Sequence, residues 1–193
     1  MKIAIIKYNA GNIHSVRLAL QREGIEPLVT DNPDEIHNAD KVIFPGVGEA
    51  STAMEYIRRN ALDEVILNLE QPFLGICLGL QLMCKYSEEN DTTCLGVFKN
   101  RVKKFPPRDK VPHMGWNAIN NLSNSLFKGI NEGAYVYFVH SYYAEISDTT
   151  ISQTEYILPF ASALQKDNYF AVQFHPEKSG KIGAQILRNF LDL

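Results

Sequence analysis

A cysteine, Cys77, stands between two glycines in the stretch LGICLGLQLM, which runs from Leu74 to Met83. An apolar run precedes the cysteine and a helical pattern follows it, so we expect a sharp turn from a strand into a helix. Such a turn forces unusual backbone angles, which glycine tolerates, and small neighbours let a substrate approach closely. The pattern G-x-C-x-G is the cysteine form of a nucleophile elbow. It also fits a small buried cysteine at a tight turn.

This position would suit a nucleophile for two electrostatic reasons. The N-terminus of a helix favours the thiolate form of cysteine. The backbone N–H of Leu78, the next residue, would point toward an oxyanion that develops on the attacked group. A catalytic cysteine also needs a base, so the histidines decide between the two interpretations.

His175 is the candidate base and lies in the segment VQFHPEKS. Residues two apart in an extended segment face the same side, so His175 and Glu177 should project together, with Pro176 ending the strand pairing. A histidine oriented by a carboxylate is the pair that activates a thiol. The ordinary alternative is a histidine at a strand end beside a solvated glutamate. Two metal ligands are a third interpretation, but the sequence offers no evident third ligand.

The segment FPGVGEA, from Phe44 to Ala50, places Val47 between two glycines after one strand and before one helix. Such a loop leaves backbone N–H groups free to bind an anion or to complete an oxyanion hole. An ordinary turn between a strand and a helix is the alternative.

These segments need elements that position them, and the first half of the chain alternates strands with helices. We expect strands at 2–8, 26–30, 41–47 and 72–76, and helices at 12–24, 50–70 and 78–88, with Gly24 as a helix stop. The second half is rich in strands, at 101–106, 116–120, 134–146, 154–158, 160–166 and 169–174, before a last helix at 180–193. Asp167 and Asn168 should form a hairpin turn. The pattern predicts one α/β domain, 1–193, whose mixed sheet has a parallel core flanked by helices and an antiparallel extension.

Composition limits the classes of function. The net charge of −3 gives no strong attraction to nucleic acid or to an anionic membrane. The odd number of cysteines, three, argues against a disulfide framework, and no cysteine or histidine pairs have zinc-ligand spacing. No apolar run is long enough to cross a bilayer, and the first residues predict a strand rather than a signal peptide, so we expect a cytoplasmic protein.

The order of the three segments resembles the class I glutamine amidotransferases over nearly the whole chain. The resemblance implies that family's fold and a triad of Cys77, His175 and Glu177. In that family the cysteine attacks the side-chain amide of L-glutamine, and ammonia passes to a synthase partner. No metal or organic cofactor is implied.

Two further segments narrow the resemblance. VPHMGWNAI (Val111 to Ile119) and YNAGNIHSV (Tyr8 to Val16) resemble the glutaminase subunits of imidazole glycerol phosphate synthases. The first also fits a buried strand with a structural histidine. Lys7 and Asn9 depart from the residues common at those positions. The resemblance implies a heterodimer with a cyclase subunit in L-histidine biosynthesis, which makes imidazole glycerol phosphate and an aminoimidazole carboxamide ribotide.

The resemblance also implies roles for individual residues. It assigns the oxyanion hole to Val47 and Leu78, glutamine binding to Gly48, Gln81, Glu89, Ser141 and Tyr142, and the partner interface to Asn12, Trp116, Tyr137 and Lys178. By themselves these residues permit plainer interpretations. Gln81 could lie on a helix surface, Glu89 in a solvated charge run and Tyr137 in ordinary strand packing.

Two competing functions stay open. A glutaminase subunit of pyridoxal 5′-phosphate synthase has a similar size, and the sequence PHMGWN argues against it. A catalytically silent regulatory module on the same fold is the other alternative. The intact set of Cys77, His175 and Glu177 argues against that module.

Overall fold

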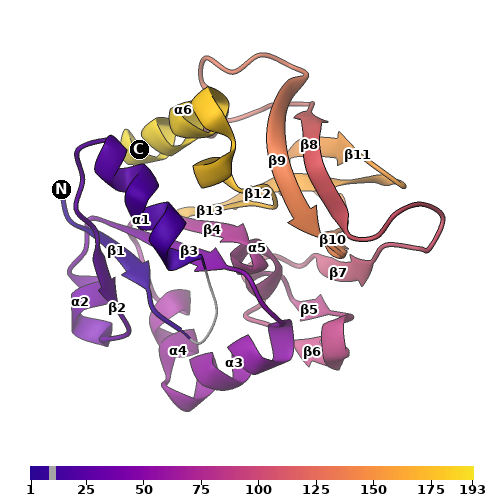
Figure 1. Ribbon diagram of the computed structural model, residues 1–193. Coiled ribbons are helices and arrows are strands. Elements are labelled where there is room, and N and C mark those ends of the chain that lie inside the picture. Colours follow the sequence, from indigo (N-terminus) through magenta and orange to yellow (C-terminus); the bar gives the residue numbers. More distant parts are fainter. Residues whose placement is uncertain (9–11) are drawn as a thin grey trace.

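The computed structural model describes residues 1–8 and 12–193 (Figure 1). In this part of the chain, one mixed sheet carries eleven strands and a separate ribbon carries two. Five neighbouring strands run parallel in the order β2-β1-β3-β4-β13. Their bounds are β1 (Ile3–Ile6), β2 (Leu28–Thr30), β3 (Lys41–Gly46), β4 (Phe73–Cys77) and β13 (Tyr169–Val172).

The sheet continues from β13 through antiparallel strands to β7, whose pairing with β5 is parallel. These strands are β12 (Pro159–Lys166), β11 (Thr150–Glu155), β10 (Tyr142–Ala144), β7 (Arg101–Lys104), β5 (Tyr86–Ser87) and β6 (Thr92–Thr93). The predicted fold class is confirmed: a parallel core with an antiparallel extension.

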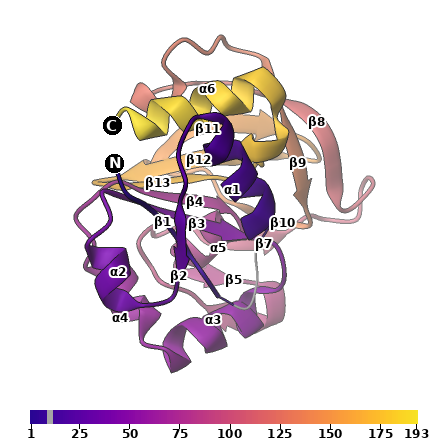
Figure 2. The ribbon, with the colours of Figure 1, turned by 60° about the vertical axis from the view of Figure 1, so that its left-hand side comes forward.

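Helices cover both faces of the parallel core (Figures 1 and 2). They are α1 (Ile13–Arg22), α2 (Pro33–His37), α3 (Ala50–Arg59), α4 (Leu62–Leu67), α5 (Leu78–Met83) and α6 (Gly180–Leu191). Alternate residues of β1 serve the two faces: Ile3 and Ile5 pack with α1 and α6, whereas Ala4 and Ile6 pack with α2 to α5. Because both faces are covered, every residue of β1 and β4 is buried.

A two-stranded ribbon stands beside the sheet on the side of α6 (Figure 1). It pairs β8 (His113–Ile119) with β9 (Ala134–His140), and Trp116 lies opposite Tyr137. The expected single strand at 134–146 is therefore wrong. The chain leaves the ribbon at His140, passes Ser141 and enters the main sheet as β10.

Several expected boundaries also differ. The predicted helix at 50–70 is two helices, because Ala61 has a left-handed φ of 52°. The helix predicted at 78–88 ends at Met83, since Cys84 is extended and the next residues pair with β7. The strand predicted at 154–158 is β11, which ends at Glu155.

One short helix, α2, was not predicted. It begins after Asn32, whose side chain accepts hydrogen bonds from the N–H groups of Asp34 and Glu35. A capping asparagine followed by proline is a recognisable helix start. The predicted hairpin turn is confirmed, because Asp167 and Asn168 join Lys166 to Tyr169.

Candidate active site

Cys77 is the last residue of β4 and directly precedes α5. Its backbone has φ 54° and ψ −106°, an uncommon conformation for a residue with a side chain. Neither Gly75 nor Gly79 has a positive φ. The expectation that the glycines absorb the unusual angles is therefore wrong, and the strained residue is the cysteine itself.

The two glycines serve packing instead. A Cβ on Gly79 would lie within 3.0 Å of the Phe44 carbonyl oxygen, and one on Gly75 would meet the Met83 sulfur at 2.5 Å. The space beside each glycine is filled by protein rather than kept for a substrate. Glycine at these positions lets α5 pack directly on β3 and β4, which fixes the N-terminus of the helix at Cys77.

We expect Gly79→Ala to lower the free energy of unfolding by about 3 kcal/mol, because the added methyl group must push α5 off β3. Gly24→Ala is the control. Its Cβ would meet no atom within 4 Å, and only its φ of 78° opposes the change, at a cost of about 1 kcal/mol. Urea unfolding followed by circular dichroism measures both values. Equal losses in the two variants would contradict this account of Gly79.

His175 and Glu177 are in contact and buried. The Nδ1 of His175 lies 2.8 Å from Oε1 of Glu177, and each side chain is only 1% exposed. The alternative of a solvated glutamate is wrong. The predicted reason for the contact is also wrong, because β13 already ends at Val172 and Pro176–Lys178 form a 3-10 turn, η3. This turn folds the carboxylate back onto the ring.

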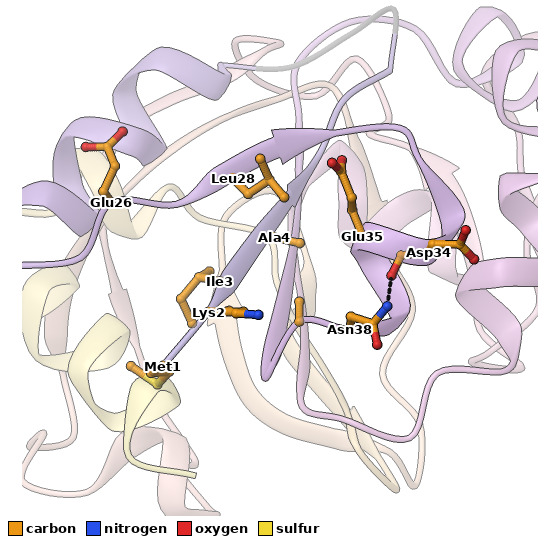
Figure 3. Close-up of a pocket in the computed structure, with 10 residues that line it drawn as sticks. Met1, Lys2, Ile3, Ala4, Glu26, Leu28, Asp34, Glu35 and Asn38 are labelled. Carbon is orange, nitrogen blue, oxygen red and sulfur yellow. Dashed lines mark hydrogen bonds between the residues drawn. The ribbon is translucent and has the colours of Figure 1, made fainter.

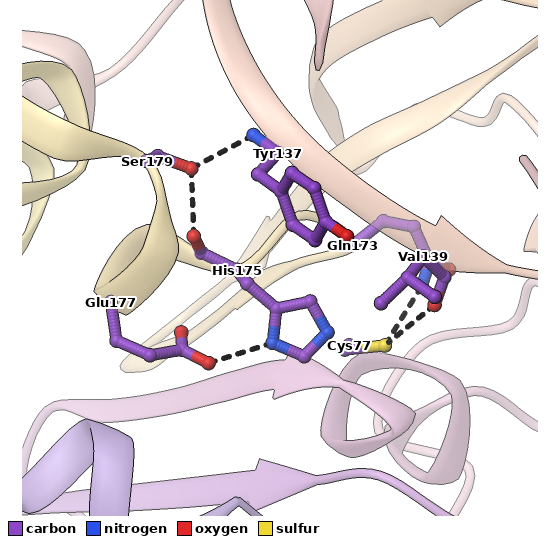
Figure 4. Close-up of polar contacts among 7 residues, drawn as sticks. All are labelled: Cys77, Tyr137, Val139, Gln173, His175, Glu177 and Ser179. Carbon is purple, nitrogen blue, oxygen red and sulfur yellow. Dashed lines mark hydrogen bonds and ion pairs between the residues drawn. The ribbon is translucent and has the colours of Figure 1, made fainter. Parts of the chain in front are cut away.

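The ribbon strand β9 fixes this turn in place (Figure 4). The N–H of His175 donates to the Tyr137 carbonyl oxygen at 2.9 Å. The hydroxyl of Ser179 donates to the His175 carbonyl oxygen at 2.7 Å and accepts from the Tyr137 N–H at 2.9 Å. Sequence reasoning missed Ser179, which lies four residues beyond the histidine.

The ring of His175 joins the carboxylate to the thiol. Figure 4 shows its Nε2 turned toward Cys77, although no hydrogen bond of ordinary geometry satisfies this atom within the described residues. Burial lowers the pKa of His175, but Cys77 and Glu177 together outweigh burial and raise it to about 10. The site therefore favours a protonated ring at neutral pH.

A cavity of about 340 Å³ opens beside the cysteine. Eight residues predicted from the sequence line it: Val47, Gly48, Cys77, Leu78, Gln81, Glu89, Ser141 and Tyr142. Three lining residues were not predicted, namely Pro112, Val139 and His140. Segments from both halves of the chain thus meet around one opening that suits a small molecule.

Two of the predicted residues have definite contacts at this cavity. Gln81 is only 5% exposed, so its interpretation as a surface residue is wrong. Its Nε2 donates to the Tyr142 carbonyl oxygen at 2.9 Å. Glu89 is partly buried, and its Oε2 accepts from the N–H of Ala50 at 2.8 Å. Burial raises the pKa of Glu89, and the neighbouring Glu49 adds to the rise.

The loop between β3 and α3 lies next to the cysteine, because Gly46 pairs with Cys77 across the two strands. Gly46 is enclosed: a Cβ there would meet the Tyr8 hydroxyl, Leu78 and the Gly79 nitrogen, all within 3.0 Å. Gly48 has a φ of 133°, which a larger residue rarely adopts. The loop is thus enclosed by protein at Gly46, and its backbone conformation requires glycine at Gly48.

Three of the predicted partner residues lie together, Trp116 and Tyr137 on the ribbon and Lys178 at the end of η3. The rings of Trp116 and Tyr137 lie 6.1 Å apart, and the Lys178 ammonium lies 5.9 Å from the Tyr137 ring centre. Trp116 is 55% exposed. Asn12 precedes α1 and has no described contact with this group. Asn9 lies outside the described residues.

A second cavity, of about 370 Å³, lies at the edge of the sheet between β1, β2 and α2 (Figure 3). None of the predicted site residues lines it. Among the described residues, no group of three or more histidine, cysteine, aspartate or glutamate side chains is placed to hold a metal ion. No helix in the described ranges combines the length and the apolar character needed to cross a membrane.

The chain belongs to the class I glutamine amidotransferase family, because residues 4–193 match the sequence model described as "Glutamine amidotransferase class-I". It is 56% identical to "Imidazole glycerol phosphate synthase subunit HisH" of Bacteroides thetaiotaomicron, with 100% of both chains covered. It is 45% identical to the protein of the same name from Escherichia coli K12, again over 100% of both chains.

Solved structures show the same fold at much lower identity. A protein from Thermoplasma acidophilum, described as a putative subunit of GMP synthase, has a TM-score of 0.76 and 18% identity, over 100% of this chain and 92% of the other. PurLQS from Thermotoga maritima has a TM-score of 0.75 and 16% identity, over 99% and 97%. At identities of 16–18%, these similarities show a shared fold.

Proposed function

We propose that this chain is the glutaminase subunit of an imidazole glycerol phosphate synthase. It hydrolyses L-glutamine to glutamate and ammonia, and a cyclase subunit uses the ammonia in L-histidine biosynthesis. The observation that carries this proposal is the identity of 45–56% over the full length of relatives with that name. The cavity beside Cys77, with His175 behind the thiol, supplies the chemistry that such a subunit needs.

The first half-reaction would use the ion pair that the raised pKa of His175 favours. The Cys77 thiolate attacks the side-chain amide carbon of glutamine and forms a tetrahedral intermediate. The imidazolium of His175 gives its proton to the amide nitrogen, and the C–N bond breaks to release ammonia. A thioester between Cys77 and the glutamyl group remains.

The second half-reaction returns the enzyme to its starting state. Neutral His175 accepts a proton from water, and the water oxygen attacks the thioester carbon. The C–S bond breaks, glutamate leaves, and the thiolate and imidazolium form again. Glu177, in contact with Nδ1 at 2.8 Å, orients the ring and stabilises its positive charge throughout.

Other residues of the cavity would bind the substrate. The N–H groups of Leu78 and Val47 would hold the oxyanion, and the carboxylate of Glu89 would hold the α-amino group of glutamine. Gly48, Ser141 and Tyr142 would line the site, because they surround the same cavity. Gln81 would support it from beneath through its bond to Tyr142.

The partner is proposed to be a separate cyclase subunit that forms a heterodimer with this chain in the cytoplasm. The group of Trp116, Tyr137 and Lys178, in which Trp116 is 55% exposed, would face that subunit, together with Asn12. The cyclase would combine ammonia with a phosphorylated ribulosyl-formimino aminoimidazole nucleotide. Residues 1–193 would act as one glutamine amidotransferase domain.

The alternative assignments are weaker on these observations. The full-length relatives carry the imidazole glycerol phosphate synthase name rather than that of a pyridoxal 5′-phosphate synthase. A silent regulatory module would have no need of a buried His175–Glu177 pair behind a strained cysteine. Purification of the chain from its source with whatever subunit it binds separates all three possibilities.

We expect the isolated chain to bind glutamine but to hydrolyse it about 10²–10³-fold more slowly than the complex, the usual effect of one missing oxyanion donor. The peptide that carries the Val47 N–H joins Gly46 to Val47, and it can turn at low steric cost because Gly46 has no side chain. In one orientation the N–H would leave the oxyanion site. Binding of the cyclase and its nucleotide would shift the population toward the productive orientation.

The measurement is glutamate release by the chain alone, with cyclase, and with cyclase and nucleotide. A stepwise rise in kcat with little change in glutamine affinity is expected. The Cys77→Ala variant serves as the blank in all three mixtures. Full activity of the isolated chain would rule out this control by the loop.

A further inference from the structure

We propose that Gln173 is a further residue that positions the nucleophile: its side-chain NH2 group donates a hydrogen bond to Cys77 Sγ and stabilises the thiolate. The inference rests on the proposed role of Cys77. Gln173 follows β13 and is fully buried, and its Nε2 lies 3.6 Å from the sulfur. Its backbone N–H donates to the Ser162 carbonyl oxygen on β12 at 2.9 Å, which fixes its position.

The direction of the Gln173 amide follows from its neighbours. A carbonyl oxygen only accepts hydrogen bonds, so Gln81 must present its NH2 group to Tyr142. The same NH2 group lies 3.1 Å from the far side of the Gln173 amide, which must therefore present its oxygen. This leaves the NH2 group of Gln173 facing the sulfur.

Two neighbours of the sulfur favour opposite protonation states. The Val139 carbonyl oxygen, 3.9 Å away, can accept from a thiol but repels a thiolate. The NH2 group of Gln173 favours the thiolate, because a donor bonds an anionic acceptor more strongly than a neutral one. The imidazolium of His175 faces the same atom (Figure 4). Gln173 therefore adds a neutral donor to the charge that His175 supplies.

The bonds that hold Gln173 extend into the β8–β9 ribbon. The Tyr142 carbonyl oxygen also accepts from His140 Nδ1 at 2.7 Å, so His140 presents its unprotonated Nε2 to His113 Nδ1 at 3.0 Å. His113 Nε2 in turn faces Asn117 Nδ2 at 3.3 Å. Burial lowers the pKa of His113 to about 4 and, as the largest effect, that of His140 to about 3. Both rings are thus neutral, as this arrangement requires.

This network gives His113 and Asn117, in the segment PHMGWN, a part in aligning the nucleophile. A signal for Gln173 was present in the sequence. It lies two residues before His175 in VQFHPE, next to the candidate base.

The test is the rate of alkylation of Cys77 by iodoacetamide against pH, read by mass spectrometry on the full-length chain. We expect Gln173→Met to move the midpoint of this rate up by about one pH unit, a tenfold change in the equilibrium constant between thiol and thiolate. Gln173→Glu keeps an acceptor for Gln81 but puts an anion beside the sulfur, so its midpoint should move further. In the complex, the acid limb of the pH profile of kcat for glutamate release should move to higher pH by the same amount, with KM nearly constant.

Gln165→Met is the matched control, because the amide of Gln165 lies on β12 and bonds only the Asp167 carbonyl oxygen in the described part of the chain. Its midpoint should equal that of the natural chain. An unchanged midpoint in folded Gln173→Met, or loss of folded circular dichroism in both Gln173 variants, would overturn the inference. If alkylated Cys77 still supported glutamate release, the proposed nucleophile would fail instead. Alkylation that stops turnover, with equal midpoints in Gln173→Met and the natural chain, would reject only Gln173.

Discussion

Replacement of Cys77 by alanine is expected to lower glutamine-dependent synthesis by the complex at least about 10⁴-fold, while synthesis from added ammonium salt continues. The reason is a division of labour. The thiol makes ammonia, and the partner consumes it. Synthesis from glutamine and from ammonium salt should be measured on the same preparation, so that loss of the partner's own activity is detected.

The other two cysteines supply matched controls for this experiment. Burial raises the pKa of Cys84 well above its usual value, and it raises the pKa of Cys94 to about 12. Neither thiol is a nucleophile at neutral pH, so Cys84→Ala and Cys94→Ala should leave turnover nearly unchanged. Equal losses in all three variants would indicate a structural set of cysteines and would remove the case for Cys77.

Within the triad, the two substitutions behind the thiol should have unequal effects. His175→Ala removes the group that would move protons at the reacting atoms, and we expect a loss of about 10⁴-fold in kcat. Glu177→Gln keeps an oxygen that can accept from Nδ1 but loses the negative charge, so a smaller loss of about 10²-fold is expected. Glutamate release by the complex, saturated with glutamine, measures both.

The pH dependence separates an orienting role of Glu177 from a structural one. The pKa of His175 is raised to about 10, and the imidazolium must protonate departing ammonia, so activity should fall as pH rises through about 10. Removal of the Glu177 charge lowers that pKa, by about 1–3 units. The alkaline limb of the profile should then move to lower pH by the same amount, and titration of the ring by NMR gives an independent value.

The same shift predicts a change in stability with pH. Because the pKa of His175 is raised from 6.5 to about 10 on folding, its protonation stabilises the folded chain fully below pH 6.5, and this contribution is lost as pH rises through about 10.

A Glu177→Gln chain that is unfolded by circular dichroism, with activity as low as that of His175→Ala, would show that the buried pair of His175 and Glu177 serves folding rather than orientation.

Much of the site could be predicted because the evidence is local. A glycine loop after one strand, a cysteine at the end of another, and the segment HPE before the last helix all lie within runs of a few residues. Strand and helix periods also placed most elements, including β3, β4 and α6, within a few residues of their observed bounds. These features depend on neighbours in the chain, and a sequence displays such neighbours directly.

Contacts between distant segments decided the remainder. The tolerance of glycine for unusual backbone angles suggested that the glycines carry them, whereas the residue with the positive φ is Cys77. Position 79 requires glycine for another reason, because a Cβ there would clash with Phe44 on a different strand. From the sequence, Gln81 could lie on a helix surface. Only the fold shows that its Nε2 donates to the carbonyl oxygen of Tyr142, which is 61 positions away. The helix predicted at 78–88 stops at Met83, since Lys85 instead donates to the Asn100 carbonyl oxygen.

The sequence by itself thus determined the family, the order of the chemical groups and the parallel core, since each follows from short patterns. Only the tertiary structure decided which groups meet. Gln173 and Cys77 lie 96 residues apart, and their contact exists because β13 pairs with β4. His175 and Glu177 meet through a turn held by β9 rather than through strand alternation. Such contacts depend on long-range pairing and close packing, and a local period of two or 3.6 residues carries no information about either.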